Sequence, residues 1–353
     1  MRSWILCILL LSAAAAGAED DASLRSPPRF HLGGFVDVEL HTSSDNVREG
    51  LDLAELDLYS TAQFSNAWSG LVEAVAQRGW TKRDPTDHHA LELNLERLYA
   101  SYSTSDVLRL EIGQTHTGIV RWNEREHRSR ILQTPIDVPA IARRPQDDGA
   151  WPLRFVGVWV SGQSRGPLGL TWEAGAGAGP GSARDVIPIF SRNRSPAGFA
   201  SVTVAPAAAP GFDFGMAVYA QHLPAQPDPL RERDLTLSAN YVNSGTEIRG
   251  EWARMNHRST RKPITYRTSG YYALLSKRLT GAAERARPYI MLDHLTVAPG
   301  EQYLQEATNE SAWAAGVRYD VTRRFSVKGE YRSQRAPDGD REMLLGVQFG
   351  LSF

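Results

Sequence analysis

The stretch from Glu342 to Phe353 reads EMLLGVQFGLSF, and its side chains alternate between two kinds. Large apolar residues share one parity, and mostly small or polar residues share the other: Met343, Leu345, Val347, Phe349, Leu351 and Phe353 against Glu342, Leu344, Gly346, Gln348, Gly350 and Ser352. Successive side chains of a β-strand point to opposite faces. The stretch therefore predicts a strand between an apolar phase and a wetter one, and the rest of the chain must show whether the apolar phase is a protein core or lipid.

Length and composition narrow the class of protein. The chain has 353 residues, which suits either two ordinary domains or one large β-barrel. A mean hydropathy of -0.36 and a charged share of 22% exclude a bundle of membrane helices. The formal charge of -1 implies no bulk attraction to nucleic acid, so no nucleic-acid partner is expected.

The N-terminal residues have the pattern of an export signal. A continuous apolar stretch at 4–16 follows Arg2, is too short to span a bilayer, and runs into Ala16-Gly17-Ala18, a typical cleavage site. We predict a signal peptide at 1–18, a short periplasmic segment at 19–29 and a single barrel at 30–353. The only cysteine, Cys7, falls in the signal, so the exported chain would have no thiol, which suits a bacterial envelope protein that folds without disulfides.

Alternating segments recur along the whole chain, whereas no sustained helical period follows Phe30. They predict sixteen strands, at 30–41, 51–64, 70–79, 90–103, 107–116, 153–163, 168–178, 198–205, 212–222, 234–243, 246–256, 264–279, 286–297, 311–321, 325–334 and 342–353. Two of them lose their parity, between Leu53 and Leu56 and near Glu96 and Arg97. We interpret both places as β-bulges, with a misplaced strand boundary as the alternative.

The connections between these strands alternate in length. Short links such as STSD, VNSG and TRR are separated by longer polar ones, and both termini fall on the side of the short links. This rhythm is typical of a transmembrane antiparallel β-barrel of the bacterial outer membrane, with periplasmic termini, and a soluble sandwich has no reason to keep it. The fold class predicted is all-β, and the predicted location is the outer membrane of a Gram-negative bacterium.

The inward parity of several strands carries charge, which identifies the two phases. The predicted lumen-lining residues are Arg249, Arg318, Lys328, Glu330 and Arg332. A soluble core could not bury such a set without several kcal/mol of desolvation each, whereas a water-filled lumen would leave them hydrated. The apolar phase is then lipid. Aromatic residues near strand ends would form interfacial girdles: Trp68, Trp151, Trp252, Trp313, Tyr319 and Tyr331.

Residues 117–152 are too long for an ordinary rim loop and partly too apolar to lie in water. The apolar side chains of RILQTPIDVPAIARRP need cover, which a loop folded into the pore against the inner wall would give them: Ile131, Leu132, Ile136, Val138 and Ile141. Such a loop would bring charges to the pore constriction, for which we predict Arg121, Glu124, Arg125, Glu126, Arg128, Arg130, Arg143 and Arg144. The alternative is a salt-bridged outer lid.

Three stretches resemble a known family. LELNLERLYASYSTSDVLRLEIGQTHTGIVRWNE, LQTPIDVPAI and PLRFVGVWVSG resemble the bacterial outer-membrane porins related to the phosphate-selective porin O and P group, over about 70 residues. Matching residues are Gly113, His116, Trp122, Asn123, Leu132, Gln133, Thr134 and Pro139. The resemblance implies a porin that passes small polar solutes, some of them anionic. The chain departs from it in having only four lysines, where phosphate-selective members have lysine-rich lumens.

The resemblance also implies partners. The terminal Phe353 is similar to the signal that the outer-membrane barrel-assembly machinery recognises, and the barrel would contact outer-membrane lipid and lipopolysaccharide. Sixteen-stranded general porins are usually trimers, so a homotrimer is one alternative for the oligomeric state.

Two other classes of function stay open. An outer-membrane hydrolase is disfavoured because the sequence has no HExxH or GxSxG motif, and no catalytic residue, cofactor or metal is predicted. His88 and His89 beside Asp84 and Asp87 suit a solvated loop better than a metal site. A non-conducting structural or adhesive barrel is the other alternative.

Overall fold

The computed structural model describes residues 27–44, 50–78, 91–105, 107–126, 131–143, 149–179, 195–224, 228–301, 303–304, 307–335 and 341–353. The predicted signal peptide, the first part of the predicted periplasmic segment and the His88-His89 pair lie outside these ranges.

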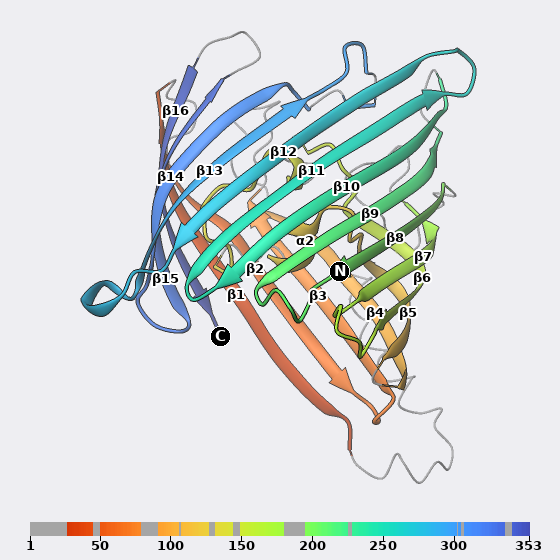
Figure 1. Ribbon diagram of the computed structural model, residues 1–353, viewed down its shortest axis with the longest axis horizontal. Coiled ribbons are helices and arrows are strands. Elements are labelled where there is room, and N and C mark those ends of the chain that lie inside the picture. The colour runs from red at the N-terminus through yellow and green to blue at the C-terminus, as the bar shows by residue number, and fades with distance from the viewer. Residues whose placement is uncertain are drawn as a thin grey trace.

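The chain forms a closed antiparallel barrel in which each strand pairs with its neighbours in sequence and β1 pairs with β16 (Figure 1). The strands are β1 Arg29–Ser43, β2 Gly50–Gln63, β3 Trp68–Arg78, β4 Leu91–Ser105, β5 Leu108–His116, β6 Arg154–Gln163, β7 Thr171–Ala178, β8 Pro196–Val204, β9 Phe212–Leu223, β10 Leu230–Asn243, β11 Thr246–Ser259, β12 Thr265–Lys277, β13 Ala286–Thr296, β14 Glu310–Asp320, β15 Phe325–Arg335 and β16 Arg341–Ser352. The predicted sixteen-stranded barrel is confirmed, and most predicted strand ends agree within about two residues.

Alternation between the two faces persists around the wall. On β9 the residues at even positions are exposed, and those at odd positions apart from the partly exposed Gly215, including Asp213, Ala217 and Tyr219, are buried inside the barrel. The last strand follows the same rule, with Met343, Leu345 and Leu351 exposed on the outside. The stretch from Glu342 to Phe353 is therefore a wall strand with an apolar outer face, as predicted.

Both predicted bulges are confirmed by the strand register. Asp37 pairs with Glu55 but Val38 pairs with Leu53, so Ala54 is the extra residue on β2. Glu73 pairs with Arg97 but Ala74 pairs with Leu95, so Glu96 is the extra residue on β4. The parity breaks in the sequence thus located both irregularities. A third register shift, between Ser103 and Ser105, gave no such signal.

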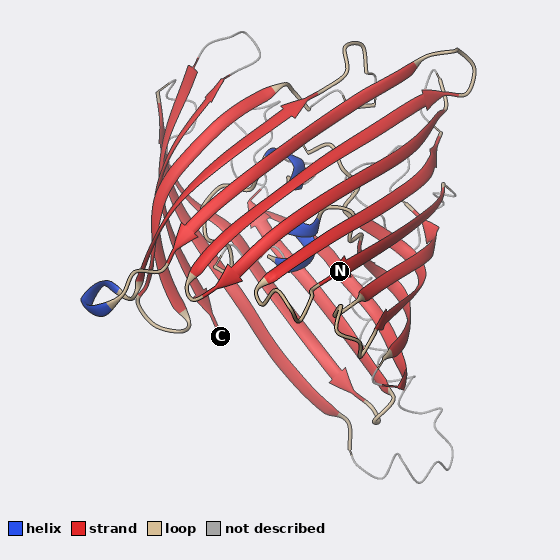
Figure 2. Ribbon diagram, in the orientation of Figure 1, coloured by secondary structure: helices blue, strands red, loops and turns tan. Residues whose placement is uncertain are grey.

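The wall differs in strand length around its circumference. Strands β5 to β8 have 8 to 10 residues, whereas β9 to β12 have 12 to 14 and cross the front of the barrel in Figure 1. Among the described residues, none of the helices is long and apolar enough to cross a membrane. Besides the one-turn 3-10 helix η4 (Gly281–Ala283), these are α2 (Arg121–Arg125) and η2 (Ala140–Ala142), which lie inside the ring of strands (Figure 2).

The aromatic residues predicted to form girdles separate into two groups. Trp68, Trp313, Tyr319 and Tyr331 are exposed on the outer face, and Trp252 is partly exposed there. Trp151 is buried in the interior cluster instead, so the prediction was wrong for this residue. It belongs to the segment between β5 and β6, whose apolar side chains pack inside the barrel.

At the chain end, Phe353 exchanges two backbone hydrogen bonds of 3.0 Å with Gly34 of β1. The aromatic ring lies beside Gly34, at a place that a Cβ atom on that residue would occupy. The end of the chain thereby helps to close the barrel, whereas its role as an assembly signal stays a prediction.

Candidate functional site

The segment between β5 and β6 enters and leaves the barrel interior at one point. Thr117 donates its backbone N–H to the carbonyl of Leu153 at 2.7 Å and its hydroxyl to the carbonyl of Pro152 at 2.6 Å. The described parts of the segment, 117–126, 131–143 and 149–152, then contact inward-facing side chains of the wall.

The first part forms α2, which a wall carboxylate holds by its N-terminus. The side chain of Glu251 on β11 accepts the backbone N–H groups of Arg121 at 2.7 Å and Trp122 at 3.3 Å. These amides have no partner within a helix, and a negative charge is favourable at that end. The indole of Trp122 packs edge-on against Tyr272, with ring centroids 5.2 Å apart. Contacts with the wall therefore stabilise this one-turn helix, which is too short to be stable by itself.

The charged side chains of α2 are paired. Arg121 donates to Glu124 at 2.6 Å and lies 3.8 Å from Asp213, and Arg125 forms an ion pair with the same Asp213 on β9. Glu124 keeps 44% of its side chain exposed. At the C-terminal end of α2, Glu126 is buried and pairs with Arg249 of β11. Of the predicted constriction residues, Arg128, Arg130 and Arg144 lie outside the described residues.

The second part, 131–143, crosses strands β12 to β16. Arg318 donates to the carbonyl of Gln133 at 2.8 Å, and the Lys328 ammonium donates to the carbonyl of Pro135 at 3.1 Å. The carboxylate of Glu330 accepts the backbone N–H of Ile136 at 3.0 Å and the hydroxyl of Tyr289 at 2.7 Å. Wall charges thus satisfy the backbone of an irregular segment, as buried polar groups require.

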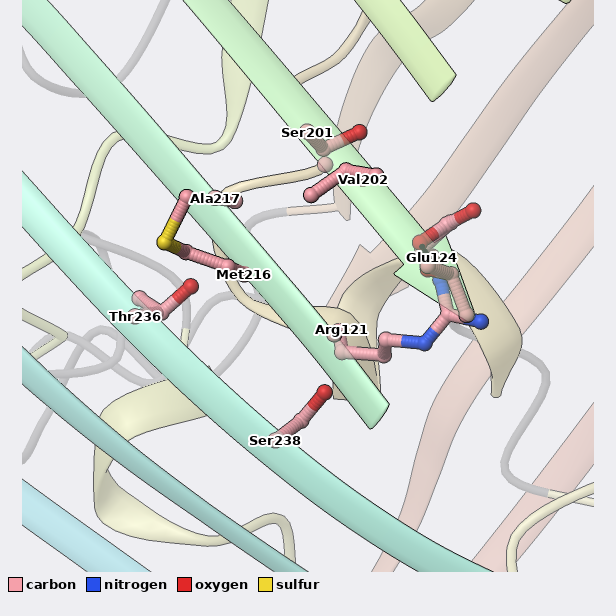
Figure 3. A pocket seen from close by; sticks show the side chains of 11 residues that line it. Arg121, Glu124, Ser201, Val202, Met216, Ala217, Thr236 and Ser238 are labelled. Carbon is pink, nitrogen blue, oxygen red and sulfur yellow. Dashed lines mark hydrogen bonds and ion pairs between the residues drawn. The ribbon is translucent and has the colours of Figure 1, made fainter. Parts of the chain in front are cut away.

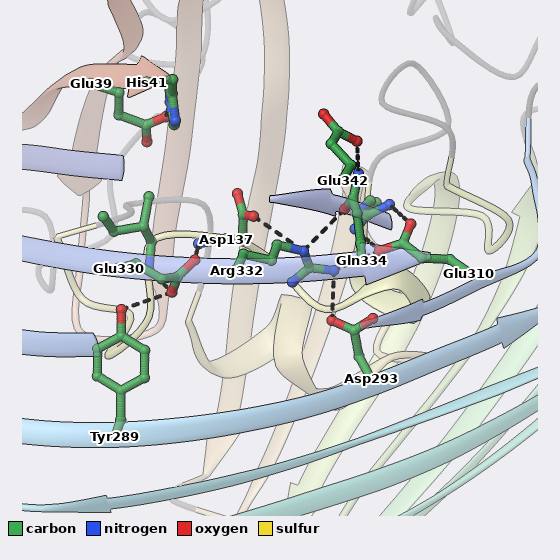
Figure 4. A network of polar contacts seen from close by, with 12 residues as sticks. Glu39, His41, Asp137, Tyr289, Asp293, Glu310, Glu330, Arg332, Gln334 and Glu342 are labelled. Carbon is green, nitrogen blue, oxygen red and sulfur yellow. Dashed lines mark hydrogen bonds and ion pairs between the residues drawn. The ribbon is translucent and has the colours of Figure 1, made fainter. Parts of the chain in front are cut away.

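Arg332 on β15 is the centre of a buried charge network (Figure 4). It donates to Asp293 at 2.9 Å and to Glu310 at 2.5 Å, and lies 3.4 Å from Asp137 of the segment. Arg143 donates to both carboxylate oxygens of Glu310, at 2.5 and 2.7 Å. Burial by itself would lower the pKa of the Arg143 guanidinium, but the charge of Glu310 outweighs this and raises that pKa above its ordinary value. Arg143 therefore anchors the segment to the wall.

Glycines on the inner face leave room for the isoleucines of the segment. A Cβ atom on Gly270 of β12 would lie 2.5 Å from Ile141, and one on Gly350 of β16 would lie 3.0 Å from Ile131. Ile131, Ile136 and Ile141 are buried, whereas Leu132 is exposed, contrary to expectation. The small residues in the inner parity of the last strand are explained in this way.

All five residues predicted to line the lumen point inward, but the expectation that water hydrates them was wrong for three, whereas Arg249 and Arg318 are partly exposed. Lys328 and Arg332 are each 1% exposed and Glu330 is 4% exposed. Arg249 is paired with Glu126 and Glu247, and Arg318 with Asp320 and the segment backbone. Alternation identifies which residues face inward, but it carries no signal for the segment that covers them.

A small recess lies between α2 and the adjacent wall. Arg121 and Glu124 line it from α2, and small polar side chains of β8 to β10 complete its lining, among them Ser201, Thr203 and Ser238 (Figure 3). The recess exists because the side chains on this part of the wall are short. On β12 to β16 the residues 131–143 occupy the corresponding space.

The inner wall carries more acid than base, which the count of arginines in the segment did not indicate. On the described strands the inward acidic residues are Asp37, Glu39, Glu55, Asp57, Glu73, Glu96, Glu111, Glu173, Asp213, Glu232, Asp234, Glu247, Glu251, Asp293, Glu310, Asp320, Glu330 and Glu342. The inward lysine and arginine residues are Arg97, Arg109, Arg154, Arg249, Arg287, Arg318, Lys328 and Arg332. Most of these acids follow from strand parity alone, once the strands are known.

No protein-family model and no curated protein sequence matches the chain. Solved structures do match it. The anion-selective porin from Comamonas acidovorans has a TM-score of 0.65 and 13% identity, covering 92% of this chain and 100% of that one. The trimer form of OmpT, an outer membrane protein of Vibrio cholerae, has a TM-score of 0.61 and 8% identity, covering 93% and 100%. The outer membrane channel DcaP of Acinetobacter baumannii has a TM-score of 0.60 and 13% identity, covering 93% and 98%. The chain therefore has the fold of the outer-membrane porins.

Proposed function

We propose that the protein is an outer-membrane porin through which small polar solutes diffuse passively, and that the segment 117–152 narrows its channel. The observation that carries this proposal is the segment itself, which backbone and ion-pair contacts fix to the inward side chains of β9 to β15. A barrel that served only as a structural or adhesive surface would gain nothing from a charged segment held across its interior. The porin fold and the resemblance in residues 91–162 support the same function.

The charge of the wall favours cations over the anions that the segment's arginines suggest. Arg121 and Glu124 neutralise each other, Arg125 and Arg143 are neutralised by wall carboxylates, and acidic residues outnumber basic ones at the inward positions of the described strands. In a narrow passage with low-dielectric walls, excess charge of one sign raises the local concentration of the opposite ion. We infer a preference for neutral and positively charged solutes.

Planar-bilayer recordings with the full-length protein test both statements. We expect stepwise conductance increases and, in a potassium chloride gradient, a reversal potential whose sign indicates selectivity for cations. Silent bilayers would refute the porin, whereas a reversal potential for anions would refute only the preference. Heat-denatured protein serves as the control.

The oligomeric state is part of the proposal. The matched OmpT structure is a trimer form, and the short strands β5 to β8 provide a low wall suited to contact between copies. Crosslinking of the protein in outer membranes tests this, and a product no larger than the monomer would contradict it.

A further inference from the structure

Five arginines cluster on the outer face of the barrel, at the long-loop end of β10 to β12. They are Arg231, Arg233, Arg254, Arg258 and Arg267, and all of them have outward parity and exposed or partly exposed side chains. The register places Arg231 directly opposite Arg258, and Asn256 between Arg233 and Arg267. With strands about 4.8 Å apart and same-face residues roughly 6.8 Å apart along a strand, the cluster covers an area about 10 Å wide and 14 Å high.

The cluster has no compensating charge on its own surface. The outward positions of β9 to β12, from Phe212 to Lys277, include no aspartate or glutamate. Among the described residues, none of the five arginines forms an ion pair. Like charges placed directly opposite each other in a sheet are destabilising, so an external anion would relieve a repulsion that the fold itself leaves.

The position along the strands is that of a lipid headgroup. Arg254 lies two residues beyond Trp252, which pairs across strands with Tyr271 on one side and Leu237 on the other; Leu237 and its own partner Met216 are apolar and exposed. Aromatic residues of membrane barrels occupy the interface between hydrocarbon and headgroups. The arginines therefore begin where the headgroup layer begins.

The neighbouring wall lacks this feature. At the same end of β13 and β14 the outward residues are His294, Thr296 and Ser311, which satisfy one another: His294 is 2.7 Å from the hydroxyl of Ser311 and 2.9 Å from that of Thr296. At the same end of β15 and β16 the outward Arg335 and Arg341 also face each other, so the sector of β10 to β12 differs in the number of its arginines, five against two.

We propose that this arginine cluster is a binding site for the phosphate groups of lipopolysaccharide, whose acyl chains lie on the apolar face below. The guanidinium fork suits phosphate geometry and keeps its charge at any working pH. The inference rests on the proposed outer-membrane location with the long loops outside, where lipopolysaccharide forms the outer leaflet.

The test uses the refolded full-length protein and a pair of double variants. Arg233→Ser/Arg258→Ser removes two charges from the cluster, and Arg323→Ser/Arg324→Ser removes two exposed arginines from the short turn between β14 and β15, at the opposite end of the barrel. Binding is measured to intact lipopolysaccharide, to lipopolysaccharide stripped of phosphate, and to phosphatidylglycerol vesicles. At about 1 kcal/mol per arginine near an anionic surface, the first variant should bind intact lipopolysaccharide about 10- to 30-fold more weakly.

The control variant should stay within about twofold of wild type, and wild type should lose affinity for the stripped lipid and as salt is raised. Equal affinity of both double variants for intact lipopolysaccharide would overturn the site, and so would undiminished binding of wild type to the stripped lipid. The site would also be overturned if the cluster variant lost as much affinity for phosphatidylglycerol vesicles as for intact lipopolysaccharide. If the double variant fails to fold, the two single variants and the salt titration decide. Conductance in phosphatidylcholine bilayers should be unchanged in the cluster variant, so failure of this site is separable from failure of the porin proposal.

Discussion

Single charged residues on the inner wall hold the interior segment in place. Lys328, Glu330 and Arg332 are inward neighbours on β15, and each one contacts a different part of 131–143 or its partners. Buried charges of this kind are costly unless each one is paired. Their number on one strand reflects the irregular backbone that they must satisfy.

Arg332→Met provides a test at this scale. The substitution removes the partner of Asp293 and one of two partners of Glu310, which leaves buried carboxylates without full compensation and should lower the free energy of unfolding by about 3 to 5 kcal/mol. Urea unfolding followed by tryptophan fluorescence measures the change. Arg335→Met, an exposed arginine on the same strand, is the matched control and should change the midpoint little. Equal midpoints for both variants would contradict the role of the network.

At the scale of elements, the strands were predictable, but the wall residues that contact the segment 117–152 were not. Alternation is a local property, so sixteen strands and the bulges at Ala54 and Glu96 follow from neighbouring residues. The wall partners of the segment lie 88 to 194 residues away in sequence, and no local pattern encodes them. The count of arginines in 117–152 indicated charge but not that Asp213 and Glu310 neutralise part of it.

Glu251 tests how α2 is held. In Glu251→Ala the backbone N–H groups of Arg121 and Trp122 lose their acceptor, so α2 should detach from the wall at times and produce fluctuations in single-channel current. Glu251→Gln keeps one acceptor oxygen and should fluctuate less. The claim fails if current noise in both variants matches wild type.

The fit of the isoleucines to the inner wall is testable with an added methyl group. In Gly270→Ala the new Cβ would meet Ile141 at 2.5 Å and the carbonyl oxygen of His294 at 2.6 Å. The segment near η2 should then shift toward the lumen, lowering both conductance and the unfolding midpoint. Gly329→Ala is the control, because a Cβ there has nothing within 4 Å. Equal changes of conductance and midpoint in the two variants would show that an added methyl group disturbs the strands themselves and not the contact with Ile141.

At the scale of the whole molecule, a nearly neutral chain separates its charges by face. The formal charge is only -1, yet acidic residues predominate among the inward positions and arginines on the outer face of β10 to β12. The net charge of the chain therefore gives no indication of the acidic interior, which would determine the preference for solutes. The strand parities and the closed topology together show it.

Two pairs of substitutions test the sign of the net charge that lines the lumen. Glu124→Gln/Asp213→Asn should shift the reversal potential toward anions, because it removes the carboxylates that neutralise Arg121 and Arg125. Arg121→Ser/Arg125→Ser should raise conductance by removing bulk and shift the potential toward cations. Recordings in a salt gradient give both values. If neither pair moves the reversal potential, the constriction lies away from α2.

The fixing of the interior segment to distant strands has a consequence for the order of folding. Residues 117–143 are synthesised before their partners on β9 to β15, and contacts of long sequence separation form late. The segment therefore stays unpacked between β5 and β6 until the strands of the C-terminal half have paired into the sheet. A species in which neighbouring strands have paired but the segment is not yet packed should precede the mature channel, and a protease that cleaves within 131–143 should detect it as a transient species.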